Sequence, residues 1–280
     1  MGIYLRPDCV EEALAALARP SPTPLTVLAG GTDFYPARVG RAIDEDVLDI
    51  SNITGLRGVI SDDAGWRLGA MTTWSELIAA DLPPLFDGLK QAAREVGGRQ
   101  IQNRGTIAGN LCNASPAADG VPPLLALDAH VEIASHADRR RLPLAVFLAG
   151  NRRTALAPHE LVLAIHVPKP PREARSAFVK LGARRYLVIS IVMAAVTAEI
   201  EAGCITSARV AVGACSAVAQ RLPGLEAALA GAPVDRQLEK RVSKAHLAPL
   251  APLDDVRGSA DYRLDATVSL LRRLLRGLAP

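Results

Sequence analysis

The sequence predicts an α+β protein with two domains. Its 280 residues are enough to bury a sizeable core and exceed what one small domain needs. Strand and helix patterns are mixed up to the stiff segment Pro168–Pro171 (PKPP), which is typical of a domain boundary. Beyond this segment, three strand patterns follow one another before the helices. We therefore expect domains at residues 1–170 and 171–280, with a three-stranded sheet in the second.

The first domain is expected to contain two lobes, and the first of these spans residues 1–54. Asp8 and Glu11 have the spacing of a capping box. The apolar side chains that follow share one helical face until Pro20 ends the helix. Two short apolar runs then predict buried strands on which this helix packs, at residues 25–28 and 47–50.

The second lobe, residues 55–170, begins with a predicted β-hairpin. Thr73 and Glu76 form a second capping box. The remaining patterns predict a proline-started helix, an apolar helix that begins at Asp119 or Pro122, and two strands. These elements are expected at residues 82–96, 122–129, 131–135 and 161–167.

In the second domain, the predicted strands precede a helix that begins at Pro223 and ends at Gly231. The last helix places four apolar side chains on its inner face and three arginines on its outer face. The strands are expected at residues 177–180, 188–200 and 205–213. The inner residues are Val268, Leu271, Leu275 and Leu278, and the outer ones are Arg272, Arg273 and Arg276.

The chain is organised around Gly105–Asp119 (GTIAGNLCNASPAAD), which combines two glycines with short polar side chains and has almost nothing bulky enough for a core. Glycine permits close approach, and Asn, Ser and Thr offer donors and acceptors that lose little entropy on ordering. Such a segment is suited to binding a ligand through its backbone. The same composition is also typical of ordinary turn-rich loops.

A second stretch of this kind, Val27–Asp33 (VLAGGTD), follows a predicted strand. Successive N–H groups at Ala29, Gly30 and Gly31 form an anion-binding concavity when the chain turns there. Neither stretch is a Rossmann fingerprint or a P-loop, because no G-x-G-x-x-G and no G-K-[ST] occurs in the sequence. Two such stretches in one chain indicate one large phosphate-bearing ligand.

The composition argues against several other classes of function. The net charge is only +3 and the basic residues are scattered, so we expect no nucleic-acid partner. The four cysteines contain no C-x-x-C pair, so we expect no structural zinc, disulfide framework or iron–sulfur cluster on this chain. The sequence has no signal-peptide pattern and no apolar run long enough for a membrane span, and we expect a cytoplasmic protein.

Motifs for substrate-directed catalysis are also missing. The sequence contains no H-E-x-x-H, no G-x-S-x-G and no metal-spaced cluster of histidine or cysteine. Its five histidines are isolated, which is more typical of surface or strand-edge residues than of ligands. This pattern suits a protein whose reactive atoms belong to a bound cofactor.

The two glycine-containing stretches resemble the flavin-binding medium subunit of the molybdenum hydroxylases, the group that contains xanthine dehydrogenase and aerobic carbon monoxide dehydrogenase. The family motifs A-G-G-T-D, T-I-G-G-N and A-S-P-x-x-D correspond in order and spacing to Ala29–Asp33, Thr106–Asn110 and Ala114–Asp119. The similarity covers nearly the whole chain, through further segments at residues 160–168, 180–184, 212–215 and 258–263.

This resemblance implies a two-lobed FAD-binding domain of the p-cresol methylhydroxylase type, with FAD held non-covalently between the lobes. The first motif region would line the diphosphate and ribityl portions of FAD, and the second would form the facing loop. The residues are Leu28, Ala29, Gly30, Gly31, Thr32 and Asp33 in the first region and Thr106, Ile107, Ala108, Gly109 and Asn110 in the second.

Three further residues correspond to family positions near the cofactor. Asp119 would accept hydrogen bonds from flavin hydroxyls, and a cap on the following helix is the alternative role. Val162 would contact the isoalloxazine or the adenine, or else be plain core. Lys180 would lie near the flavin ring and raise its reduction potential, with a solvated lysine as the alternative.

The sequence departs from the family pattern at two places. Ala108 stands where the family has a second glycine, so we expect it to keep a negative φ or to bear strain of about 1 kcal/mol. Residues 186–190 lack the acidic residue that many relatives have, which weakens the expectation for the surroundings of Lys180. Cys112 lies in the cofactor loop, where a small buried thiol is a commoner explanation than redox chemistry.

The resemblance also implies partners. A large molybdopterin subunit would hydroxylate the substrate, a small subunit with two [2Fe–2S] clusters would conduct electrons, and this chain would pass them to NAD, a quinone or oxygen. The assembly would be a dimer of heterotrimers. The alternatives are a self-sufficient FAD-dependent oxidase, disfavoured by the missing substrate-directed base, and a docking subunit without flavin, disfavoured by the two intact motif regions.

Overall fold

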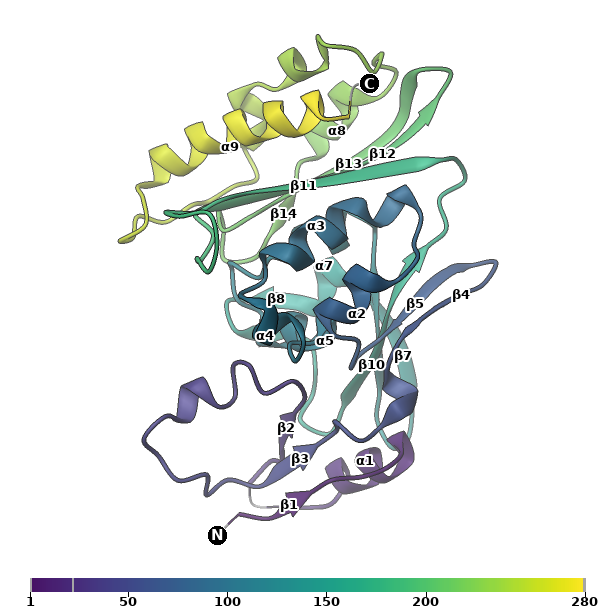
Figure 1. Ribbon diagram of the computed structural model, residues 1–280, viewed down its shortest axis with the longest axis vertical. Helices are drawn as coiled ribbons and strands as arrows, with labels where there is room; N and C mark the ends of the chain where they lie inside the picture. Colours follow the sequence, from purple (N-terminus) through teal and green to yellow (C-terminus); the bar gives the residue numbers. More distant parts are fainter. Residues whose placement is uncertain (1, 22, 279–280) are drawn as a thin grey trace.

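The computed structural model describes residues 2–21 and 23–278, whose elements are stacked as three layers along the longest axis (Figure 1). The N-terminal layer, purple in the figure, contains a three-stranded sheet and is the first lobe. The middle layer, the second lobe, contains a five-stranded sheet with short helices. The C-terminal layer contains a four-stranded sheet covered by two helices, green and yellow.

The sheet of the first lobe is parallel and has its most buried strand in the centre. All three residues of this central strand are buried, as expected for a strand flanked on both edges and covered by a helix. In spatial order, the strands are β1 (Tyr4–Leu5), β3 (Val47–Asp49) and β2 (Thr26–Leu28).

Helix α1 (Val10–Leu17) packs its apolar face into one cluster with the central strand of this sheet, as predicted. The predicted capping box of Asp8 and Glu11 is wrong. The N-cap is Cys9, whose side chain makes no capping bond, and the Asp8 N–H donates to the Glu12 carboxylate at 3.1 Å. The helix is therefore held by the burial of its apolar face rather than by a side-chain cap.

The central strand of the second lobe is β10 (Leu161–Pro168), which joins two cores. Its register shifts between Val162 and Ala164, and the alternation of its side chains shifts with it. Leu161 and Leu163 pack into the cluster of helix α1, whereas Ile165 packs into the main core of the second lobe. One strand therefore fixes the first lobe against the second. In spatial order, the sheet is β4 (Val59–Ser61), β5 (Gly65–Gly69), β10, β6 (His130–Ala134) and β7 (Arg139–Pro143).

Short helices cover the inner face of this sheet. The capping box of Thr73 and Glu76 is confirmed and begins the first of them. The helical elements of this part of the chain are α2 (Trp74–Ala79), η3 (Pro84–Phe86), α3 (Asp87–Glu95), α4 (Arg99–Gln102), α5 (Ile107–Asn113), α6 (Val121–Ala126) and α7 (Leu144–Phe147), with a small hairpin of β8 (Leu148–Gly150) and β9 (Arg153–Thr154). The short turn η2 (Thr54–Leu56) precedes them and packs its Leu56 into the cluster of helix α1. The predicted hairpin and both predicted strands of this lobe are confirmed.

The C-terminal sheet has four strands, so the prediction of three strands is wrong. The additional strand is only two residues long and pairs with Ala211 and Val212, which is too short to give a periodic pattern in the sequence. The predicted start of the second strand at Val188 is also wrong, because Leu187 has a φ of 52° and regular pairing begins at Val192. The strands are β11 (Ala174–Leu181), β12 (Val192–Glu201), β13 (Cys204–Gly213) and β14 (Gln220–Arg221).

Two helices and two short 3-10 turns cover the outer face of this sheet (Figure 1). The last helix buries three of the four predicted apolar residues, Val268, Leu271 and Leu275, and exposes the three predicted arginines. Leu278 is also buried, but it lies beyond the end of the helix. The elements are α8 (Pro223–Leu229), η4 (Leu238–Arg241), η5 (Lys244–Leu247) and α9 (Ala260–Arg276).

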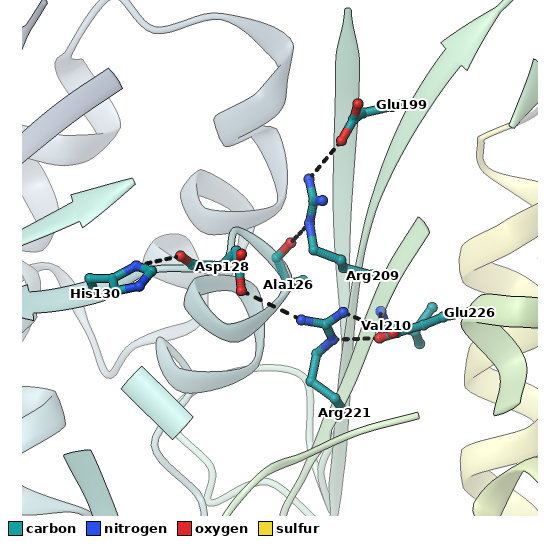
Figure 2. Close-up of polar contacts among 8 residues, drawn as sticks. All are labelled: Ala126, Asp128, His130, Glu199, Arg209, Val210, Arg221 and Glu226. Atoms are coloured by element: carbon teal, nitrogen blue, oxygen red, sulfur yellow. Dashed lines mark hydrogen bonds and ion pairs between the residues drawn. The ribbon is translucent and has the colours of Figure 1, made fainter. Parts of the chain in front are cut away.

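Polar contacts fix the C-terminal sheet to helix α6 (Figure 2). The guanidinium of Arg209 donates to the carbonyl of Ala126 at 3.0 Å and to the buried carboxylate of Glu199 at 3.1 Å. Nearby, Arg221 lies 3.8 Å from the carboxylate of Asp128. The helix that follows the central stretch is thus bonded to the C-terminal sheet.

Within the residues that the structure describes, no helix combines the length and the apolar character needed to cross a bilayer.

Candidate functional site

A cleft of about 480 Å³ lies between the two lobes and is lined by both glycine-containing stretches. Its size is in the usual range for a small-molecule or cofactor site. Of the predicted residues, the lining includes Ala29, Gly30, Gly31, Thr32, Asp33, Thr106, Ala108, Gly109, Asn110 and Val162. Leu28, Ile107, Asp119 and Lys180 are not among its lining residues.

The first wall of the cleft presents backbone N–H groups. In residues 2–21 and 23–278, no acceptor bonds the N–H of Gly30, Gly31, Thr32 or Asp33. Gly31 has a φ of 74°, a left-handed conformation that glycine adopts without strain. Successive N–H groups in such a turn form a concavity with positive partial charge, which favours an anion.

Gly30 allows the two walls to touch. A Cβ atom at this position would lie 1.9 Å from the carbonyl oxygen of Arg104, which directly precedes the second glycine-containing stretch. The absence of a side chain at Gly30 therefore lets the lobes approach each other. At Gly30 the close approach is therefore between the backbones of the two walls, in addition to any approach of a ligand.

The second wall is the start of helix α5. The hydroxyl of Thr106 accepts a hydrogen bond from the Gly109 N–H at 3.0 Å and caps the helix. The expectation that Thr106–Asn110 form a facing loop is wrong, because residues 107–113 are helical. Ala108 lies in the first turn with helical backbone, where alanine is favourable, so the first of its two expected alternatives, a negative φ without strain, is confirmed.

Other predicted residues lie behind the walls. Leu28 and Ile107 have exposed fractions of 4% and 0% and belong to the packed interior. Val162 faces both the cleft and the main core. Hence the backbone of the motif regions, more than their apolar side chains, is presented to the cleft.

Asp119 and Lys180 form a buried ion pair, with 2.7 Å between carboxylate and ammonium. Ser190 donates to the other carboxylate oxygen at 2.6 Å. Burial raises the pKa of Asp119, while the Lys180 ammonium and the Ser190 hydroxyl oppose that rise. The helix-cap alternative for Asp119 is wrong, because the N-cap of α6 is Gly120, and a solvated Lys180 is excluded by its exposed fraction of 5%.

The ion pair lies directly behind the second wall. The N–H of Gly120, next to Asp119, donates to the side-chain oxygen of Asn110 at 3.3 Å, and Asn110 lines the cleft. Lys180 comes from β11 and also approaches the carbonyl of Glu95 at 3.4 Å. The pair therefore connects the C-terminal domain to the cleft wall.

An aromatic and charged group at one end of the cleft was not predicted. The guanidinium of Arg38 lies 3.8 Å from the ring centre of Phe34, and both residues line the cleft. Arg38 also pairs with the carboxylate of Glu45, which accepts a hydrogen bond from Thr26 at 2.6 Å. These bonds hold the pKa of Glu45 at about 2. The sequence gives only one weak signal for this group, the four-residue spacing of Phe34 and Arg38.

Cys112 also lines the cleft, and its side chain is exposed there. The expectation of a small buried thiol at this position is therefore wrong.

Comparison with known proteins decides the family. The family model described as "FAD binding domain in molybdopterin dehydrogenase" matches residues 1–170, more than half of the chain. The chain belongs to this family. A second model, "CO dehydrogenase flavoprotein C-terminal domain", matches residues 177–278. This molybdopterin dehydrogenase flavoprotein thus consists of an FAD-binding domain followed by a flavoprotein C-terminal domain.

Individual relatives cover almost the whole flavoprotein. It is 30% identical over 254 residues to the xanthine dehydrogenase FAD-binding subunit of Escherichia coli O157:H7, covering 89% of this chain and 87% of the relative. It is 31% identical over 281 residues to the nicotinate dehydrogenase FAD-subunit of Eubacterium barkeri, covering 97% and 94%. Among solved structures, a chain of carbon monoxide dehydrogenase from Hydrogenophaga pseudoflava matches with a TM-score of 0.88 at 28% identity, covering 100% of this chain and 98% of that chain.

The residues of this flavoprotein's cleft fit FAD. Unbonded N–H groups at Gly30–Asp33 suit the diphosphate, and the N-terminal end of α5 lies across the cleft with the same polarity. Apolar residues elsewhere in the lining, including Trp74, Val96 and Val162, suit aromatic rings.

Proposed function

We propose that this flavoprotein is the FAD-carrying electron-transfer subunit of a molybdenum hydroxylase complex. Electrons would come from [2Fe–2S] clusters on a partner subunit, pass through FAD on this chain, and leave to an external acceptor such as NAD, a quinone or oxygen. The observation that carries this proposal is the row of unbonded N–H groups at Gly30–Asp33, facing the capped start of α5 across one cleft.

Bound FAD would supply the redox chemistry, because a flavin can transfer electrons one at a time or in pairs. The protein's own residues bind and orient it. The Gly30–Asp33 N–H groups hold the diphosphate, Gly30 keeps the two walls together, and Val162 contacts a ring of the cofactor. The Asp119–Lys180 ion pair lies near the flavin ring and sets the electrostatic potential there, which adjusts how readily the ring accepts electrons.

The proposed architecture places the domains at residues 1–170 and 171–280, with the first built from lobes of residues 1–54 and 55–170 in the p-cresol methylhydroxylase manner. The partners are a large molybdopterin subunit and a small [2Fe–2S] subunit, assembled as a dimer of heterotrimers in the cytoplasm. Names among the relatives support separate partner chains, such as the carbon monoxide dehydrogenase medium chain of Hydrogenophaga pseudoflava and the nicotine 6-hydroxylase medium subunit of Paenarthrobacter nicotinovorans.

Two other functions receive less support. A self-sufficient FAD oxidase needs a base and a substrate pocket beside the flavin, and the described cleft lining holds no histidine or glutamate, while its one carboxylate, Asp33, is paired with Arg152. A docking subunit without flavin has no use for a row of unbonded N–H groups, which lowers stability when no ligand or water bonds it.

The first test is the colour and cofactor content of the purified chain. We expect a yellow protein that releases FAD on heating or acid treatment, identified by chromatography, because no covalent link is proposed. A folded, colourless preparation that takes up no added FAD would contradict the proposal. The electron-transfer role is tested by mixing the complex with substrate and following iron–sulfur reduction and flavin reduction separately, with cluster reduction expected first.

A further inference from the structure

Arg152 bridges the two walls at the rim of the cleft. Its guanidinium lies 3.3 Å from the carboxylate of Asp33 and donates a short hydrogen bond to the side-chain oxygen of Asn113. Asp33 ends the glycine-containing stretch of the first lobe, whereas Asn113 ends helix α5 of the second. Both bonded partners line the cleft.

The backbone holds Arg152 at the rim independently of its side-chain bonds. Arg152 lies between β8 and β9 with a φ of 56°, and its N–H donates to the carbonyl of Ala114 at 2.9 Å. Ala114 is itself left-handed, with a φ of 46°. Non-glycine residues are strained in this conformation, and such residues are concentrated at functional sites.

The pair of Arg152 with Asp33 is exposed and therefore exchangeable. The two side chains have exposed fractions of 57% and 61%, and ion pairs between exposed side chains contribute little to stability. A second anion entering the cleft can displace the carboxylate of Asp33 from the guanidinium at small cost.

The cofactor of the proposed function needs a cation at this place. The diphosphate of FAD carries two negative charges, and the N–H groups that would receive it end at the negatively charged Asp33. The cleft lining itself contains one arginine, Arg38, which is bonded to Glu45. Arg152 is the charged group at the rim that can offset both the diphosphate and Asp33.

We propose that Arg152 is a cofactor-binding residue that exchanges the carboxylate of Asp33 for the diphosphate of FAD. Its planar guanidinium offers parallel donors that match phosphate oxygens. The hydrogen bond to Asn113 holds the guanidinium toward the cleft. The left-handed backbone of Arg152 fixes the position from which the side chain extends. The inference deepens the proposed function and depends on FAD being the ligand.

The test compares Arg152→Asn with Arg153→Gln. Asparagine tolerates the left-handed conformation, so the first variant removes the charge while keeping the backbone. Arg153 is the neighbouring arginine, whose side chain makes no ion pair within the described residues, so the second variant removes one positive charge from the same hairpin. Each chain is stripped of flavin, and the dissociation constants of FAD, ADP and riboflavin are measured by equilibrium titration at two salt concentrations.

We expect Arg152→Asn to weaken FAD and ADP binding by about ten- to a hundredfold, the usual effect of losing a hydrogen bond to a charged group. Riboflavin, which carries no phosphate, should bind as it does to the unchanged chain. The salt dependence of FAD binding should decrease in Arg152→Asn and remain in Arg153→Gln. Arg152→Lys should restore part of the affinity because it restores the charge but not the planar fork.

Equal FAD affinity in Arg152→Asn and the unchanged chain would overturn the inference. An equal loss of affinity for riboflavin and for FAD would also overturn it, because that result would mean that Arg152 only holds the two lobes together. Failure of the unchanged chain to bind FAD at all would overturn the proposed function, and this inference with it.

Discussion

The ammonium of Lys180 lies 2.7 Å from the carboxylate of Asp119, and this ion pair joins the C-terminal sheet to the segment behind the cleft wall. The exposed fractions of the two side chains are 5% and 8%, so each charge has little contact with water and is stabilised mainly by the opposite charge. The hydroxyl of Ser190 completes the group. Any change to one member therefore alters both stability and the electrostatic potential behind the second wall of the cleft.

We expect Lys180→Met to lower the free energy of unfolding by about 3–5 kcal/mol, because it leaves the Asp119 carboxylate buried without its cation. Urea unfolding measures this change. The control is Lys244→Met, which breaks a pair of similar length, 2.6 Å to Asp265, whose side chains have exposed fractions of 75% and 63%. That change should cost little, because water screens an ion pair between exposed side chains. Similar losses in the two variants would contradict the importance of burial.

The proposed place of the ion pair near the flavin ring predicts opposite shifts in midpoint potential. Lys180→Met leaves a negative charge and should lower the two-electron potential of bound FAD, whereas Asp119→Asn leaves a positive charge and should raise it. A change of 1.4 kcal/mol corresponds to about 30 mV for a two-electron couple. Spectroelectrochemical titration of the FAD-loaded chain measures both.

The Lys180→Met shift should depend on pH. Burial raises the pKa of Asp119, and removal of the ammonium takes away a group that opposes this rise. Asp119 then binds a proton as the pH falls, so the lowered potential should return toward its original value at lower pH. Unchanged potentials in both variants at every pH would place the ion pair away from the ring, without affecting the proposal that FAD binds in the cleft.

Gly30→Ala should separate the two walls of the cleft. The added Cβ would lie 1.9 Å from the Arg104 carbonyl oxygen, and such overpacking costs about 1–3 kcal/mol. We expect lower stability and reduced FAD content, measured on the same preparation. Gly55→Ala is the matched control, because a Cβ there would meet nothing within 4 Å. If Gly30→Ala retains full FAD content, contact between the walls is not needed for binding.

We expect protonation of Glu45 to contribute to unfolding of the protein in acid. Hydrogen bonds from Arg38 and Thr26 lower its pKa from 4.5 to about 2 in the folded chain. The stabilisation is therefore complete above about pH 4.5 and is lost as the pH falls toward 2. Unfolding measured from pH 6 to pH 2 should show a steeper loss of stability in the unchanged chain than in Glu45→Gln. Parallel curves would show that this carboxylate has no role in acid unfolding.

The sequence by itself determined those features that depend on residues a few positions apart. The spacing of Thr73 and Glu76 specifies a capping box, and the periodicity of residues 268–275 specifies the buried face of the last helix. Gly30 and Gly31 indicated an N–H-rich turn, and the cleft contains that turn. Local spacing failed at Asp8, where burial of the helix face outweighed the capping pattern, and at β14, which is too short for a periodic pattern.

Only the tertiary structure decided which distant side chains meet. Asp119 and Lys180 are 61 residues apart, and Asp33 and Arg152 are 119 apart. Their contacts depend on the packing of α6 against the C-terminal sheet and on the register shift in β10 that joins the two lobes. The physical reason is that an ion pair forms wherever packing brings opposite charges together, and packing is settled by the burial of whole sheet and helix faces, which no local spacing of charged residues encodes.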